Sequence, residues 1–174
     1  MDRVAQEAGV AKGSLYNYFP NKVELLRFVH EKAVEPMRRN AREILATDMP
    51  ATAKIESMLR AWFMYIDEHR GLFNFVFNDY AVQKVLQRQH GLAQADAVRD
   101  LGRVIEQGIE EGAFRKIDAN RVADFLFGAV RQMCDRQLAA KDIEPVREMV
   151  KALVDLFLHG VGKGVGQKGV EHER

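Results

Sequence analysis

Residues 4–22 read VAQEAGVAKGSLYNYFPNK, and this stretch decides the fold. The apolar residues within 4–8 recur at helical spacing and share one face. Gly9 supplies a backbone that can adopt φ > 0, which closes a helix. Residues 12–19 resume a helical pattern, and Pro20 ends it because proline restricts the residue before it. Two short helices joined by a glycine turn form a helix-turn-helix, whose second helix can enter a major groove of DNA.

The second helix of this pair has an inner and an outer face. Spacing places three residues on the inner face: Leu15, Tyr18 and Phe19. On the outer face, Lys12 and Tyr16 can reach phosphates and Asn17 can pair with the edge of adenine. Gly13 on the same face lets the backbone come close to its target. Lys22 follows the turn, where a third helix would aim it at a phosphate. An ordinary helical hairpin with a polar outer face would show the same pattern, and composition alone favours that alternative.

The density of matching residues favours DNA binding. Residues 8–26, AGVAKGSLYNYFPNKVELL, resemble the helix-turn-helix signature of the TetR family of bacterial transcriptional repressors. The resemblance implies a homodimer that binds a palindromic operator and releases it when a small molecule enters the C-terminal domain. The residues expected to contact DNA, on this resemblance, are Lys12, Gly13, Ser14, Tyr16, Asn17, Tyr18 and Lys22.

The family pattern includes one more helix than this motif contains. TetR-like chains carry a helix before the motif, whereas Met1 falls inside the first helix of the pair. That additional helix would normally cover Val4, Ala5 and Leu15, so we expect an exposed apolar face here. We also expect Met1 to be an internal methionine, or the chain to have been cut.

Composition excludes several classes of protein. The 174 residues are 47% hydrophobic and 29% charged, with a net charge of +1, which is ordinary for a globular protein. The only cysteine, Cys134, leaves no partner for an intramolecular disulfide. No apolar run reaches the ~18 residues that span a bilayer, and no secretory leader opens the chain. We therefore expect a cytoplasmic protein with no membrane partner.

The rest of the chain predicts an all-α fold. Apolar periodicity predicts one long connecting helix from Pro20 to about residue 45, and further helices over 51–68, 72–77 and 81–112. Asp118 is a suitable N-cap for the next helix, and the last helix follows Pro145. We assign residues 1–30 to the helix-turn-helix domain and 31–160 to a helical bundle for effector binding and dimerisation. The glycine-rich residues 161–174 are expected to form a flexible tail.

The two C-terminal helices carry more apolar surface than one subunit needs. Residues 122–134 are apolar almost all round, and 146–161 carry a continuous apolar stripe. Two such helices per subunit suggest a four-helix homodimer interface. The alternative, that both helices are core of a monomer, stays open.

Catalytic motifs are not found. The five histidines show no metal-binding helical spacing, and there is no GxSxG, Walker or CxxC pattern. Residues 164–169 fit GxGxxG, but no strand precedes them and too few residues follow for a dinucleotide site. We expect no enzyme activity, no metal site and no cofactor other than an unknown small-molecule effector.

A binding cavity is the remaining candidate site. Aromatic residues and methionines fall on separate helices of the C-terminal body, which suits a pocket for a small apolar or aromatic effector. Each of them could equally be plain core. The candidate effector-binding residues, with Arg131 and His69 as polar anchors, are Met58, Trp62, Tyr65, His69, Phe73, Phe77, Phe125, Arg131 and Met133.

These observations favour a ligand-responsive transcriptional regulator, a repressor, that binds operator DNA as a homodimer. The first alternative is a TetR-like helical interaction protein that no longer binds DNA. The second is a small helical-bundle enzyme or ligand carrier, which only the aromatic residues of the expected cavity favour.

Overall fold

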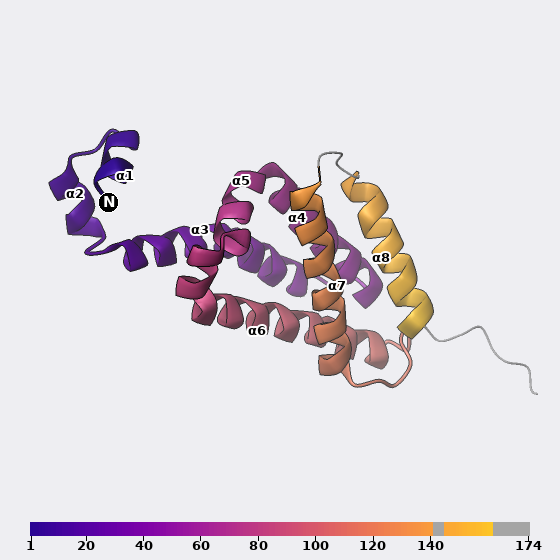
Figure 1. Cartoon of the computed structure of the whole chain (residues 1–174). Coiled ribbons are helices and arrows are strands. Elements are labelled where there is room, and N and C mark those ends of the chain that lie inside the picture. Colours follow the sequence, from indigo (N-terminus) through magenta and orange to yellow (C-terminus); the bar gives the residue numbers. More distant parts are fainter. Residues whose placement is uncertain (141–144, 162–174) are drawn as a thin grey trace, which may run out of the picture.

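The computed structural model describes residues 1–140 and 145–161, and the regular structure in this part of the chain is helical, which confirms the all-α prediction. Figure 1 shows a small N-terminal unit projecting from one end of a larger helical body. Elements in chain order are α1 (Asp2–Glu7), α2 (Lys12–Tyr18), α3 (Lys22–Leu45), α4 (Ala51–Glu68), α5 (Arg70–Phe73), the π-helix η1 (Asn74–Asn78), α6 (Tyr80–Glu110), α7 (Ala119–Ala139) and α8 (Val146–Val161).

Helices α1 and α2 form the expected helix-turn-helix. Gly9, at φ 66°, closes the first helix as its sequence position predicts. Ala5 and Leu15 are 3% and 7% exposed, so the expectation that both would lack cover is wrong. Val4, 43% exposed, does face outward. The N-terminal unit thus buries Ala5 and Leu15 and leaves Val4 and Val10 open to solvent.

The inward position predicted for Tyr18 is wrong, because this side chain is 80% exposed. Tyr18 is the last residue of α2, and the chain leaves the helix at Phe19, where the backbone becomes extended. Phe19 then turns onto Phe28 of α3, with the ring centroids 5.1 Å apart. Of the two aromatic residues that the spacing places on the inner face, only Phe19 packs inward.

Helix α3 is the single long connection that the sequence predicts. It begins at Lys22 rather than Pro20, because the Asn21 side chain accepts a hydrogen bond from the backbone N–H of Glu24 at 3.0 Å. Its 24 residues continue through Pro36, and at 1.5 Å per residue they span about 36 Å. In Figure 1, α3 runs from the N-terminal unit into the body.

Two apolar clusters hold the body together. The main cluster joins α4, the C-terminal half of α6, α7 and α8 around residues such as Leu59, Ile105 and Val150. A second and smaller cluster joins α3 to η1 and the start of α6: Leu26, Ala33, Val76, Val82 and Leu86. The N-terminal half of α3 is therefore held by few apolar contacts, and such regions open more readily than the main core.

Helix α6 is continuous, so its glycines, which in the sequence are compatible with breaks or with close packing, do not break it. Gly102 and Gly108 are buried, and a Cβ at Gly108 would meet the Phe114 ring at 2.2 Å, so these positions serve close packing. The predicted N-cap of α7 is confirmed, since Asp118 accepts a hydrogen bond from the Arg121 N–H at 3.0 Å. Helix α8 continues to Val161, and residues 162–174, which include the GxGxxG pattern, lie outside the described residues. No helix in the described ranges is long and apolar enough to cross a membrane.

Candidate functional site

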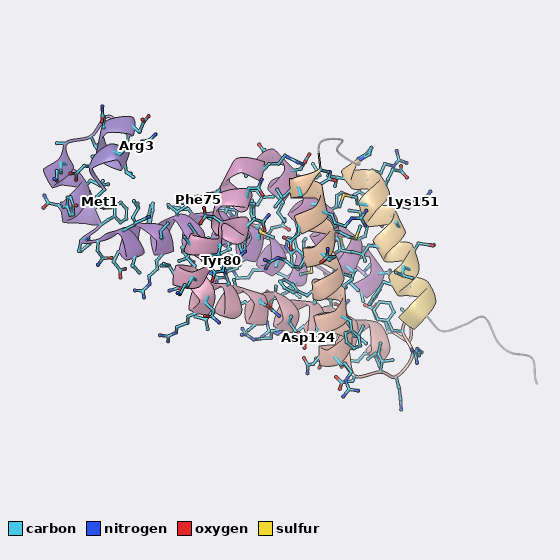
Figure 2. All side chains as sticks on the ribbon, in the orientation of Figure 1. Met1, Arg3, Phe75, Tyr80, Asp124 and Lys151 are labelled. Atoms are coloured by element: carbon cyan, nitrogen blue, oxygen red, sulfur yellow. The ribbon has the colours of Figure 1, made fainter. Side chains whose placement is uncertain are left out.

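The outer face of the N-terminal unit is open to solvent. All seven residues expected to contact DNA are exposed: Lys12, Gly13, Ser14, Tyr16, Asn17, Tyr18 and Lys22. Six of them come from α2, and Lys22 opens α3. Figure 2 shows this unit, with Met1 and Arg3, at the end of the molecule away from Lys151 of α8.

An ion pair crosses this unit. The Lys12 Nζ lies 2.8 Å from Asp2 Oδ2, which ties α2 to α1. The hydrogen bond from Lys12 lowers the pKa of Asp2, and the same bond raises the pKa of Lys12. The ammonium also lies 5.9 Å from the centre of the Tyr16 ring. Lys12 would have to exchange this carboxylate for a phosphate oxygen in order to bind DNA, whereas no ion pair within the described residues involves Lys22.

A cavity of about 130 Å³ lies inside the body. Residues from α3, α4, α5, η1, α6 and α7 line it, most of them apolar: Val34, Met37, Arg38, Ala41, Trp62, Ile66, Phe73, Phe77, His90, Ala93, Gln94, Ala97, Asp100, Phe127, Val130, Arg131, Cys134, Asp135 and Leu138. An apolar enclosure with a few convergent polar groups is typical of small-molecule sites.

The two arginines of this cavity are each paired with a carboxylate. Arg38 pairs with Glu31 at 2.8 Å and with Asp96 at 3.3 Å. Arg131 holds Asp135 through Nε at 3.1 and 3.2 Å, and its guanidinium lies 5.5 Å from the Phe77 ring centre. A ligand therefore meets two arginines that are already paired, in a wall that is mostly apolar but also contains His90, Gln94 and Asp100.

One wall of the cavity is a stack of aromatic rings. Phe77 lies between Phe73, at 5.5 Å and 9°, and His90, at 4.8 Å and 23°. Phe77 belongs to the π-helix η1, and π-helical turns often occur at functional sites. His30 of α3 does not line the cavity, but its ring centroid lies 4.9 Å from that of His90 and 5.8 Å from that of Phe77. The ring stack thus lies between the cavity and His30.

Several polar atoms around this wall are buried without a hydrogen-bond partner in the described structure. Among them are both ring nitrogens of His30, Nε2 of His90 and Nε1 of Trp62. Burial, then His90 and Arg38, lower the pKa of His30 to about 4, and burial lowers the pKa of His90. Both imidazoles are therefore neutral at pH 7. His90 donates a hydrogen bond to the backbone carbonyl of Val76, which leaves its Nε2 as an unused acceptor.

Four of the nine predicted effector-binding residues line the cavity: Trp62, Phe73, Phe77 and Arg131. The other five do not. Met58 is fully buried in the main cluster, and Met133 packs against that cluster. Tyr65 contacts the far edge of Phe73, and His69 stacks on Tyr65, so both lie behind the lining. Phe125 is 70% exposed on the outside of α7.

Sequence reasoning missed the contributions of α3 and α6, among them Arg38, His90 and Asp100. The signal was nevertheless present. On α6 the lining residues recur at 90, 93, 94, 97 and 100, one helical stripe in which two positions are alanine. Small side chains on an inward stripe leave a hollow, whereas the sequence prediction rested on large aromatic residues and methionines.

Metal and thiol chemistry have little basis here. No group of three or more acidic, histidine or cysteine side chains that could hold a metal occurs in residues 1–140 and 145–161. Burial raises the pKa of the Cys134 thiol to about 12, so it is protonated at neutral pH and acts as an apolar wall residue.

A helix-turn-helix thus projects from a helical body that contains a cavity, and one helix, α3, joins the two. Family comparisons agree. Residues 1–29 match the model of bacterial regulatory proteins of the tetR family, and residues 48–135 match the tetracyclin repressor-like C-terminal domain. The chain belongs to the TetR family. Its members are DNA-binding transcriptional regulators, so the expectation of a regulator rather than an enzyme is confirmed.

Individual relatives are distant. The chain is similar to the HTH-type transcriptional activator FasR of Mycolicibacterium smegmatis, with 30% identity over 58% of this chain and 48% of that protein. It thus spans about half the length of that relative. A transcriptional regulator from Cytophaga hutchinsonii has a similar fold, with 20% identity, a TM-score of 0.76 and coverage of 94% of this chain and 88% of that one. A proposed fatty acid metabolism regulator from Clostridium perfringens is comparable, with 22% identity, a TM-score of 0.76 and coverage of 93% and 88%.

Proposed function

We propose that this protein is a cytoplasmic repressor that binds a palindromic DNA operator as a homodimer and releases it when a small molecule fills the cavity. The observation that carries the proposal is the path of α3. This one helix begins at the exposed DNA-binding face and continues into the cavity wall through Val34, Arg38 and Ala41. A change in the cavity can therefore move the DNA-binding unit without passing through any flexible linker.

The proposed mechanism is a shift between two positions of α3. A ligand that binds one position better shifts the population toward it, and operator affinity falls by that differential affinity. The small cluster that holds the N-terminal half of α3 suits such a movement. Two recognition helices must reach half-sites about 34 Å apart, one helical turn of DNA, or a multiple of it. A small rotation of α3 in each subunit would disturb that spacing.

The cavity favours an effector with an apolar body and at least one hydrogen-bonding group. Trp62 and Phe127 offer apolar surface, and the unpaired Nε1 of Trp62 is a donor that such a group could use after a small adjustment. The paired arginines do not require a charged ligand. An acyl chain is one such apolar body, and one protein of similar fold is a proposed regulator of fatty acid metabolism.

Alanine substitution tests the DNA-binding face. We expect Tyr16→Ala and Lys22→Ala each to weaken binding to a duplex that the wild-type protein selects from random DNA, by about tenfold or more. Lys22→Ala should weaken binding to all DNA sequences alike, because it removes a phosphate contact. It should also lower the salt dependence of binding by about one ion. Fluorescence anisotropy at several salt concentrations measures both effects.

Tyr80→Ala is the matched control for Tyr16→Ala. Tyr80 is 82% exposed at the start of α6, outside the N-terminal unit. Its removal should leave DNA affinity unchanged. Wild-type affinity in both Tyr16→Ala and Lys22→Ala would show that these residues do not contact DNA. If the wild-type protein selects no duplex at all, the alternative of an interaction protein that no longer binds DNA is supported.

A further inference from the structure

The contact between α3 and the cavity wall contains two imidazoles with unused hydrogen-bonding capacity. His30 is 1% exposed, and neither of its ring nitrogens has a partner. His90 has an unused Nε2 acceptor, and the two ring centroids are only 4.9 Å apart. A neutral imidazole carries one N–H donor and one acceptor, so His30 could donate to Nε2 of His90. In this conformation the two rings lie side by side without that bond.

Unpaired buried polar groups are costly. Each one carries a desolvation cost of about 1–3 kcal/mol, which an apolar residue of similar shape would avoid. If this contact were merely structural, leucine at both positions would avoid the desolvation cost. The cost would be recovered if α3 and α6 had a second relative position in which the His30 N–H reaches His90. A contact with two alternative arrangements is the kind of element through which ligand binding moves a helix.

The cavity is placed to control this contact. Phe77 and His90 line the cavity and contact His30, whereas His30 is not part of the lining. Phe77 and His90 therefore lie between the cavity and His30, although α3 reaches the cavity wall farther along, at Val34, Arg38 and Ala41. A molecule that filled the cavity would push Phe77 and His90 toward His30, which would favour the hydrogen bond and shift α3.

We propose that His30 and His90 are positioning residues that couple the cavity to α3: they are apart when the cavity is empty and joined by an N–H···N hydrogen bond when it is filled. This inference rests on the proposed function, because it assigns a coupling role to the wall of the effector cavity. Neither His30 nor His90 is among the residues that the family resemblance indicates or among the predicted effector-binding residues.

A substitution that fills the cavity replaces the unknown effector in the test. Ala97 lines the cavity on α6, so Ala97→Phe should occupy the space, and Ala93→Leu is a milder version of the same change. Ala95→Phe is the matched control, because Ala95 is exposed on the same helix and does not line the cavity. We expect Ala97→Phe to weaken binding to the selected duplex by about 5- to 50-fold, which lies within the usual range of coupling between sites, and Ala95→Phe to leave it unchanged.

The role of the histidines is tested by combining these changes with substitutions of His30. His30→Leu keeps apolar packing and removes both nitrogens, so it should abolish most of the effect of Ala97→Phe. His30→Asn, which keeps a donor and an acceptor, should retain part of it. If Ala97→Phe and Ala93→Leu weaken DNA binding as strongly in the His30→Leu variant as in the protein that keeps His30, the proposed coupling is overturned.

Nuclear magnetic resonance of ¹⁵N-labelled histidine gives a readout that does not depend on DNA. Ala97→Phe or Ala93→Leu should change the ring-nitrogen shifts of His30 and His90 toward those of a hydrogen-bonded pair, and Ala95→Phe should not. Unchanged shifts in both cavity-filling variants would overturn the inference. If the wild-type protein selects no duplex, the proposed function fails, and the shifts still decide whether the two histidines pair.

Discussion

At the scale of single residues, His30 is the most unusual group in the described structure. The side chain is fully buried, and its pKa falls to about 4 because of burial, His90 and Arg38. Arg38 is itself paired with Glu31 and Asp96, and Arg131 acts on His90 from α7. The folded protein therefore takes up a proton at His30 less readily than the unfolded chain, whose histidine titrates near its ordinary value of 6.5.

This lowered pKa predicts a loss of stability in acid. Above pH 6.5 the contribution of neutral His30 to the free energy of unfolding is fully present. This contribution is lost as the pH falls from 6.5 through about 4, because protons bind the unfolded state first. Between pH 7.5 and 4.5, we expect the free energy of unfolding to fall by about 2–3 kcal/mol less in His30→Leu than in wild type. Urea unfolding at both pH values and a fixed protein concentration measures the difference.

His30→Asn should flatten the profile in the same way, since asparagine does not titrate in this range. The comparison is between variants at each pH, so carboxylates elsewhere in the chain affect all three proteins alike. Parallel profiles for wild type and both variants would show that His30 is not protonated less readily in the folded state.

At the scale of elements, the sequence predicts most helices because caps and breakers mark their ends. Gly9, Asp118 and Pro145 lie at helix ends as predicted, whereas α3 has its N-cap at Asn21 and does not begin at the predicted Pro20. The glycines of α6 left both breaks and close packing open, because a sequence does not show whether a glycine ends a helix or makes room for a neighbour. That depends on a residue outside the helix, which here is Phe114.

Alanine substitutions at Gly108 and Gly91, both on α6, should have opposite effects on stability. At Gly108 a Cβ would lie 2.2 Å from the Phe114 ring, which is 1% exposed and has no free space to move. Overpacking of this kind costs about 1–3 kcal/mol. At Gly91 nothing lies within 4 Å, so alanine should stabilise the helix by about 0.5–1 kcal/mol. Chemical denaturation that shows both variants to be equally stable would contradict the packing described for Gly108.

At the scale of the whole molecule, the sequence predicts the architecture better than the cavity. The helix-turn-helix could be predicted because its residues are neighbours in the chain. The cavity could not, because it needs the relative position of five helices and a π-helical turn, and helical spacing alone cannot say whether Met58 or Trp62 faces a void. Whether the chain forms a homodimer likewise depends on the surface of the folded subunit, which the sequence alone does not show.

The exposed apolar side chains of α7 and α8 identify the surface on which the dimer prediction depends. Phe125 and Leu156 are 70% and 71% exposed, more than a monomer would favour on helices of this length. In a four-helix interface both would be buried, so Phe125→Glu and Leu156→Glu would each place a charge in an apolar contact. Light scattering coupled to size-exclusion chromatography should show a dimer for wild type and a shift toward monomer for either variant.

Tyr80→Glu is the control for these two variants, because Tyr80 is 82% exposed but lies on α6, outside both helices. It should remain dimeric. Operator binding should weaken together with dimerisation in Phe125→Glu and Leu156→Glu, because two half-sites need two linked recognition helices. The effect should diminish at protein concentrations high enough to restore the dimer, as mass action requires. A monomeric wild-type protein, or a dimer that tolerates both glutamates, would exclude α7 and α8 as the interface.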